Sequence, residues 1–366
     1  MKTRFFLLSF LILIPVYMSA QNWQVVWHDE FEGESLNLEK WSFQTGTGSE
    51  YGLIDWGNDE LQYYREQNVT VSDGMLHITA KRESYNGKSY TSGRIRTIDK
   101  GDWTYCRIEF RAKMPLGKGL WAAVWMLPTD EEYGGWAASG ELDIMEYLGD
   151  EHNVVHGTLH YGNAWPNNKQ NGTSFTLSEG DFYSEFHDFT LEWVEGEMKW
   201  FVDGQLYQTL DQGDWWSTGG PFPAPFNKDF HLLINLAVGG NWPGNPVGTT
   251  FPQDLVLDYI RVFQDLPIGI EEELAEGKMD SGLHQNIPNP FHLTTSIAYT
   301  IDQYEHVRLE VYDATGRKVD TLVDGHRNPG TYSVIFDGTD LAPGLYTCKF
   351  SSGDFQESKH VLRVNK

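Results

Sequence analysis

Short runs that alternate apolar and polar residues fill the chain from residue 22 to about residue 264, separated by turns rich in Gly, Asn, Asp and Pro. Such alternation is typical of strands with one buried face, and turn dipeptides such as Asp73-Gly74 and Asp203-Gly204 are of the hairpin kind. Sustained helical periodicity is hard to find. The clearest runs are 68–83, 102–115, 187–210, 230–240 and 255–264. The pattern predicts an all-β domain over residues 21–265, built as an antiparallel sandwich or jelly roll.

The pattern is interrupted once and then resumes. Residues 266–285 lack alternation and are rich in acidic side chains, which predicts a linker. From residue 286 short strands return and continue to the end of the chain. We expect residues 286–366 to form a small Ig-like β-sandwich, a second domain that carries no cluster of carboxylates comparable to that of the first.

The first twenty residues have a different character. A short basic start is followed by an apolar run and then by small residues, with a cleavage point after Ala20. Residues 1–20 are therefore predicted to be a secretory signal peptide. A membrane anchor is the alternative, but the run is too short to span a bilayer and no later segment could do so.

The composition excludes some classes of binding partner. The chain of 366 residues has 52 acidic and 27 basic side chains, a net charge of −25, which disfavours binding to nucleic acid or to anionic membranes. Aromatic residues make up 14% of the chain; most are expected in the core and a few in a sugar-binding site. Cys106 and Cys348 lie in different predicted domains, so we expect two isolated thiols.

The segment SGELDIMEYLG, residues 139–149, carries three carboxylates: Glu141, Asp143 and Glu146. In a regular strand Glu141 and Asp143 share one face, whereas Glu146 points into the core, where an unpaired carboxylate is costly. One extra residue, a β-bulge near Ile144–Met145, turns Glu146 back to the acidic face. The odd spacing therefore predicts a bulge that brings the three acids together.

Three neighbouring carboxylates repel one another, so at least one pKa should be raised. Retaining glycoside hydrolysis needs this pair of states: one ionised carboxylate as nucleophile and one protonated carboxyl as acid. The alternatives are a calcium cluster or a solvated acidic strand. Calcium loops are irregular and rich in Gly and Asn, which this segment is not, and a solvated strand does not require the unusual spacing.

The segment resembles the ExDxxE signature of glycoside hydrolase family 16, in the bulged form of its laminarinases and related endo-β-1,3-glucanases. The resemblance covers Trp23 to Gln264 and includes WHDEF, GNDELQYY, YTSGRI, HGTLHYG and NLAVGGNWPG. It implies a concanavalin-like jelly roll. It also implies a nucleophile at Glu141, an assisting acid at Asp143 and a general acid/base at Glu146.

Further residues follow from the same resemblance. His160 would lie beside the acid/base, with a hydrogen-bonded strand histidine as the alternative. Trp121 and Trp125, four apart on one predicted strand, would be stacking walls, with core packing as the alternative. Arg94 would bind sugar hydroxyls or serve as an ion-pair partner. The full implied substrate-binding set is Asn58, Glu60, Arg94, Trp121, Trp125, Trp136, His160 and Trp242.

The family resemblance also implies a structural calcium ion away from the acids. Its ligands would be the backbone carbonyls of Glu30 and Gly74 and the carboxylate of Asp258. No cofactor is implied for catalysis.

The tail, with NIPNPF, VYDATGRKV and LAPGLYTCKF, resembles the C-terminal sorting domains of type IX secretion. This resemblance implies a bacterial protein exported through the outer membrane and either released or held at the cell surface. A carbohydrate-binding module is the alternative, but residues 286–366 contain no Trp.

The sequence thus predicts a secreted, monomeric, retaining endo-β-1,3-glucanase that hydrolyses laminarin-type β-glucans. A relative that acts on mixed-linkage glucan or on a marine galactan is the alternative within the same class. A non-catalytic glucan-binding protein is a third hypothesis, which the intact set of three acids disfavours.

Overall fold

The computed structural model describes residues 21–265, 281–286, 289–291, 294–327, 329–339, 341–353 and 355–364. The predicted signal peptide and most of the predicted linker lie outside these residues. Two units with separate hydrophobic cores are described. Among the described residues, no helix has the length and hydropathy required to cross a membrane.

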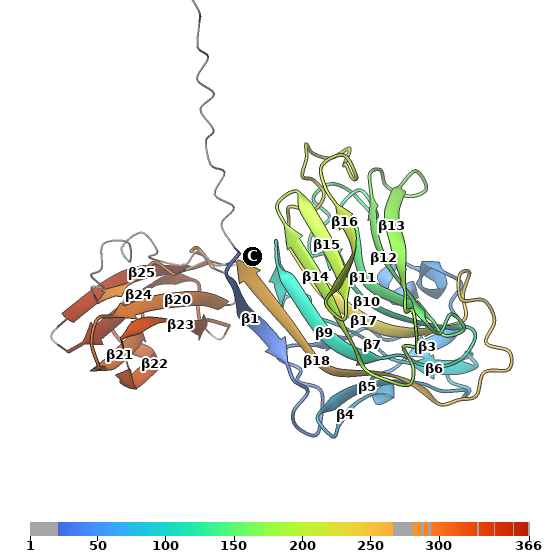
Figure 1. The fold of residues 1–366 in the computed structure, drawn as a ribbon, viewed down its shortest axis with the longest axis horizontal. Helices are drawn as coiled ribbons and strands as arrows, with labels where there is room; N and C mark the ends of the chain where they lie inside the picture. The colour runs from blue at the N-terminus through green and yellow to red at the C-terminus, as the bar shows by residue number, and fades with distance from the viewer. Residues whose placement is uncertain are drawn as a thin grey trace, which may run out of the picture.

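The first unit is a sandwich of two eight-stranded antiparallel sheets (Figure 1). Sheet I contains β1 (Trp23–Asp29), β4 (Val69–Ser72), β5 (Met75–Ala80), β9 (Arg107–Lys113), β14 (His187–Val194), β15 (Glu197–Val202), β16 (Gln205–Leu210) and β18 (Gln253–Asp265). Its order is β16-β15-β14-β9-β18-β5-β4, with β1 also paired to β18.

Sheet II carries the acidic segment. It contains β2 (Ser42–Phe43), β7 (Arg94–Arg96), β8 (Asp102–Trp103), β10 (Leu120–Pro128), β11 (Glu141–Leu148), β12 (Val154–Tyr161), β13 (Lys169–Thr176) and β17 (Phe230–Val238). Its order is β13-β12-β11-β10-β17-β7-β2, with β8 also paired to β17. Shorter elements lie beside the sheets: η1 (Ser49–Tyr51), η2 (Ile54–Gly57), η3 (Glu66–Asn68), β3 (Gln62–Tyr64) and β6 (Tyr90–Ser92), the last two paired in parallel.

The predicted alternation of apolar and polar residues appears in the structure as alternation of buried and partly exposed side chains. Every second residue of β9, from Ile108 to Ala112, is buried, and the residues between them are partly exposed. The predicted hairpin turn at Asp73-Gly74 joins β4 to β5, with both residues at positive φ, 55° and 72°. Side chains of both sheets meet in one core that includes Trp193 and Trp200. The all-β jelly-roll prediction is confirmed.

The C-terminal unit has two small sheets (Figure 1). One contains β19 (Gly282–Leu283), β20 (Thr294–Ile301) and β23 (Gly330–Asp337), and the other contains β21 (Glu305–Tyr312), β22 (Lys318–Arg327), β24 (Gly344–Ser352) and β25 (Phe355–Arg363). The unit begins before residue 286, because β19 pairs with β20 and Leu283 is buried in its core. The last part of the predicted linker, around Gly282–Leu283, is therefore strand.

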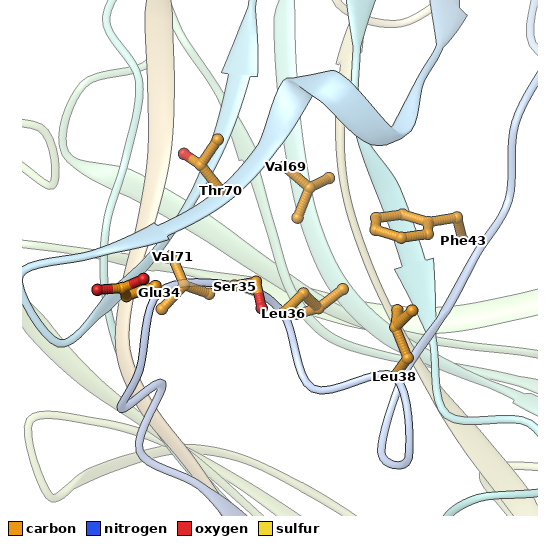
Figure 2. Close-up of a pocket in the computed structure, with 8 residues that line it drawn as sticks. All are labelled: Glu34, Ser35, Leu36, Leu38, Phe43, Val69, Thr70 and Val71. Atoms are coloured by element: carbon orange, nitrogen blue, oxygen red, sulfur yellow. The ribbon is translucent and has the colours of Figure 1, made fainter.

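Both cysteines are free, as predicted, and both are fully buried. A small pocket of about 250 Å³ lies between the chain segment 34–43 and edge strand β4 (Figure 2). Its lining is mostly apolar: Glu34, Ser35, Leu36, Leu38, Phe43, Val69, Thr70 and Val71. It contains none of the predicted site residues, which belong to other segments of the chain.

Candidate active site

Strand β11 contains the predicted bulge. Against β10, Val124 pairs with Met145 and Trp125 pairs with Asp143, so Ile144 has no partner. Against β12, the register also shifts between Asp143 and Glu146. Two consecutive residues, Ile144 and Met145, can therefore both point into the core, and Glu146 returns to the face that carries Glu141 and Asp143.

Each outer acid accepts a hydrogen bond from a tryptophan. The indole nitrogen of Trp136 donates to Glu141 Oε2 at 2.9 Å. The indole nitrogen of Trp121 donates to Glu146 Oε1 at 3.1 Å. Two acids are thus held at fixed positions on the outer face of sheet II, with Asp143 between them in the sequence.

His160 lies elsewhere than predicted. It is the cross-strand partner of Glu141, and its Nε2 is 3.3 Å from Asp143 Oδ2 and 3.6 Å from Glu141 Oε1. The prediction placed it beside the acid/base Glu146. The antiparallel register explains the difference, because it sets His156, four residues earlier, opposite Glu146.

Burial and the repulsion between neighbouring carboxylates raise the pKa values of both glutamates of the site. Burial, then the charge of Asp143, raises the pKa of Glu141 to about 7, although His160 and the Trp136 hydrogen bond act against this. Burial, then the charges of Asp143 and Glu141, raises the pKa of Glu146 well above its usual range. A carboxyl that stays protonated near neutral pH is what a general acid requires.

The same charges act on the imidazole. Burial lowers the pKa of His160, but the hydrogen bond with Asp143 and the negative charge of Glu141 outweigh it and raise the pKa to about 9. His160 is therefore cationic at neutral pH. Its charge favours the ionised form of Glu141.

Arg94 lies in the same sheet, on β7, and is buried. Its Nε donates to Gln44 Oε1 at 2.7 Å, and its guanidinium lies over the rings of Trp56 and Trp125, 4.5 and 4.9 Å from the ring centroids. Trp125 in turn donates to Asn235 Oδ1 at 2.8 Å. Arg94 therefore helps to fix the position of Trp125.

Glu60 is buried, and one of its carboxylate oxygens is already bonded within the protein. Oε2 accepts hydrogen bonds from Gln62 Nε2 at 2.6 Å and from the Tyr64 hydroxyl at 3.1 Å. Burial raises the pKa of Glu60, with hydrogen bonds from Gln62, Tyr64 and Asn58 acting against it. The predicted role in binding sugar hydroxyls is thus restricted to its other oxygen, while Asn58 is partly exposed.

The predicted tryptophans lie on one side of the sheet. Trp121 and Trp125 are partly exposed, whereas Ala122 and Val124 beside them are buried, so the pair points outward as expected. Trp242 meets Trp121 edge to face at 5.5 Å. These contacts build an aromatic wall at the end of the site that contains Glu146.

Sequence reasoning missed several neighbours of this site. The ring of His156 is 5.0 Å from that of Trp242, and Trp56, Gln44 and Asn235 hold Arg94 and Trp125. The spacing of His156 and His160 on one strand, four apart and therefore on one face, was a signal for the first of these. The others come from distant segments and had no local signal.

Among the described residues, one group could hold a metal through three side chains: Glu141, Asp143 and His160. The predicted calcium ligands lie elsewhere. Asp258 is the residue at which β18 changes partners, from β5 after Leu257 to β1 from Ile260 onward. Glu30 follows β1 and Gly74 precedes β5, so all three residues lie on or directly beside neighbouring strands of sheet I.

The chemistry of this second set suits calcium, which prefers oxygen ligands such as carbonyls and carboxylates. The Asp258 side chain is about half exposed, and its Oδ2 is 3.6 Å from Arg111 Nε, so an ion would have to compete with that guanidinium. The calcium site stays a prediction.

The structure thus combines a two-sheet jelly roll with a bulged strand that carries two tryptophan-bonded glutamates, and a pair of carboxyl groups is what glycoside hydrolysis uses. Residues 56–256 match the family described as glycosyl hydrolases family 16. The chain belongs to this family.

Its relatives include enzymes of several organisms. A glucan endo-1,3-beta-glucosidase A1 of Niallia circulans is 41% identical over 267 residues, which cover 69% of this chain and 39% of that protein. A beta-glucanase of Rhodothermus marinus is 40% identical over 289 residues, which cover 72% of this chain and 95% of that protein. This chain therefore spans less than half of the Niallia protein and nearly all of the Rhodothermus one.

A solved structure supports the fold. The laminarinase catalytic domain of Thermotoga maritima is 41% identical, with a TM-score of 0.62, over 68% of this chain and 100% of that one. The tail also matches, since residues 287–364 correspond to a secretion system C-terminal sorting domain. The protein is therefore exported to the cell surface or the surrounding medium.

Proposed function

We propose that this protein is a retaining endo-β-1,3-glucanase that cuts laminarin-type glucans outside the cell. The relatives at about 40% identity that act on 1,3-linked glucans support the substrate class. The observation that carries the chemistry is the register shift in β11, which sets Glu146 on the same face as Glu141.

In this proposal Glu141 attacks the anomeric carbon of the bound glucose while Glu146 gives its proton to the departing glycosidic oxygen. Water then enters and its oxygen attacks the same carbon, while Glu146 takes a proton from it and the bond from that carbon to Glu141 breaks. Two inversions at one carbon restore the original configuration. No metal or other cofactor takes part in either step.

The residues around Glu141 and Glu146 influence the ionisation of the nucleophile and the orientation of both acids. The cationic His160 lies beside Glu141 and Asp143 and favours a charged nucleophile. The hydrogen bond from Trp136 orients Glu141, and that from Trp121 orients Glu146. Exposed faces of Trp136 and Trp242 are suited to stacking against sugar rings.

The test is sugar release from laminarin, lichenan, agarose and carrageenan. We expect cleavage of laminarin with a β-configured first product by NMR, and a loss on the order of 10²–10⁴-fold or more in kcat for Glu141→Gln and Glu146→Gln. Glu197→Gln, the same change on sheet I, serves as the control. A wild-type protein inactive on all four polymers would overturn the proposal.

The same assay separates the alternatives. Two further similar proteins are described as a keratan-sulfate endo-1,4-beta-galactosidase and as a beta-1,3-glucan-binding protein. Preference for lichenan or a galactan would point to an enzyme that acts on mixed-linkage glucan or on a galactan. Laminarin binding with no turnover would point to a non-catalytic glucan-binding protein.

Three further properties are part of the proposal. The protein works as a monomer. Calcium binds at Glu30, Gly74 and Asp258 and stabilises the fold. An N-terminal signal peptide, residues 1–20, directs the first export step.

A further inference from the structure

Strand β11, which carries the three acids, is hydrogen-bonded on its core side by a residue of the other sheet. The indole nitrogen of Trp200, on β15 of sheet I, donates a hydrogen bond to the backbone carbonyl oxygen of Asp143 at 3.0 Å. Trp200 is fully buried. A side chain of one sheet thus bonds to the main chain of the opposite sheet across the core.

This contact falls at the bulge. In a regular strand the carbonyl oxygens point at neighbouring strands and are used by the ladder. The pairing of β11 with both β10 and β12 shifts directly after Asp143, and a bulge disrupts the ladder at that point. A buried carbonyl without a partner is costly, and the Trp200 indole is the donor that satisfies this one.

The residue opposite the bulge on β12 is Gly157, which lies between the partners of Asp143 and Glu146, Thr158 and His156. A methyl group at Gly157 would lie 2.7 Å from Cδ1 and 2.9 Å from Nε1 of Trp200. It would also lie 2.6 Å from the hydroxyl of Tyr207 on β16. Only glycine leaves room here for the indole to reach the carbonyl.

We propose that Trp200, seated in the space left by Gly157, is a positioning residue that fixes the bulge of β11 and thereby the placement of Glu146 relative to Glu141. The inference rests on the proposed function, because it assigns those two acids to the reaction. Trp200 touches no reacting atom. It acts through the peptide that follows Asp143, three residues before Glu146.

The consequence is specific to the chemical step. If the bulge loosens, Glu146 can rotate toward the core side of the strand, while the tryptophans that bind the sugar keep their places on β10 and in the loops. Misplacement of a reacting group by about 1 Å can cost on the order of 10²-fold in rate. Loss of the indole hydrogen bond should therefore lower kcat more than it changes KM.

The chain offers a matched control. Trp193 on β14 is also fully buried in sheet I, and its indole nitrogen has no hydrogen-bond partner among the described residues. Trp200→Phe and Trp193→Phe both remove an indole from the same core. Only the first removes a hydrogen bond to the acidic strand.

The experiment compares full-length wild type, Trp200→Phe and Trp193→Phe on laminarin. We expect Trp200→Phe to lower kcat at least tenfold with KM within about twofold, and to shift the basic limb of the pH profile, which reports the general acid. Trp193→Phe should keep kcat within about threefold and the profile unchanged. Equal effects of the two variants on kcat and on the profile would overturn the proposal.

Hydrogen exchange gives a readout that does not depend on activity. In Trp200→Phe, amides of residues 141–148 should exchange at least tenfold faster than in wild type, and in Trp193→Phe they should not. If wild type were inactive on every glucan, the proposed function would fail, but this measurement would still test the contact. Unchanged exchange in Trp200→Phe would overturn the proposal even with an active wild type.

Discussion

One imidazole lies within reach of two of the three carboxylates, and it is the residue whose removal should change the pH profile most cleanly. His160 lowers the pKa of Glu141, against burial and the charge of Asp143, which raise it to about 7. Without that cation the pKa of Glu141 rises further. The nucleophile then ionises at higher pH, so the acidic limb of kcat/KM moves upward.

We expect His160→Asn to shift the acidic limb upward by on the order of one pH unit. The basic limb should move in the same direction, because His160 also lowers the pKa of Glu146. The pH dependence of laminarin hydrolysis measures both limbs. His156→Asn, on the same face of β12, is the control, and identical shifts in the two variants would contradict the assignment.

At the scale of the element, the residue directly before strand β11 is a glycine that is closely surrounded by other side chains. Gly140 has a φ of +91°, and a Cβ there would lie 2.9 Å from Cε1 of Phe226 and 3.0 Å from Cζ of Phe230. Gly140→Ala should therefore destabilise the fold by roughly 2–4 kcal/mol, from backbone strain and from overpacking. The midpoint of thermal unfolding, Tm, measures this as a drop of roughly 5–15 °C.

The control for this prediction is Gly180→Ala. Gly180 has a similar φ of +81°, but nothing lies within 4 Å of an added Cβ. It carries the backbone strain alone, about 1–2 kcal/mol. If both variants lose the same stability, contact with the two phenylalanines has no energetic role.

Structural elements could be predicted where the pattern of neighbouring residues in the sequence determines them. The hairpin at Asp73-Gly74 and the bulge at Ile144–Met145 both follow from the order of residues along one strand, because side-chain direction alternates strictly. The position of His160 was not predictable, since it depends on how β12 pairs with β11. A shift of register by a few residues exchanges His156 for His160 opposite a given acid.

Contacts between distant segments also escaped prediction. Trp200 belongs to a run that alternates like any other buried strand, and nothing in that run indicates a bond to Asp143. Such contacts arise when two sheets close on each other, which the pattern of a single strand does not describe.

At the scale of the whole molecule, calcium should act on stability and leave the chemistry unchanged. Asp258 lies on sheet I, and Glu30 and Gly74 lie directly beside strands of that sheet, whereas the acids lie on sheet II. Saturation at about 100 times the Kd would add about 2.7 kcal/mol, roughly 5–10 °C in Tm. Thermal unfolding with calcium and with a chelator measures the difference.

Asp258→Asn should abolish this calcium-dependent rise in Tm. Asp188→Asn is the matched control, because Asp188 also pairs with Arg111, at 3.1 Å, but lies outside the predicted set. Calcium should leave kcat at 25 °C unchanged for all three proteins. A rise in Tm that persists in Asp258→Asn would place the ion elsewhere.

The two buried cysteines bear on the conditions that the exported chain meets. Burial raises the pKa of Cys348 to about 12 and shifts that of Cys106 in the same direction. Almost no thiolate, the reactive form, is present at neutral pH, and each thiol is enclosed in its own core. The folded protein therefore forms and exchanges no disulfides through these two thiols, whether its surroundings are oxidising or reducing.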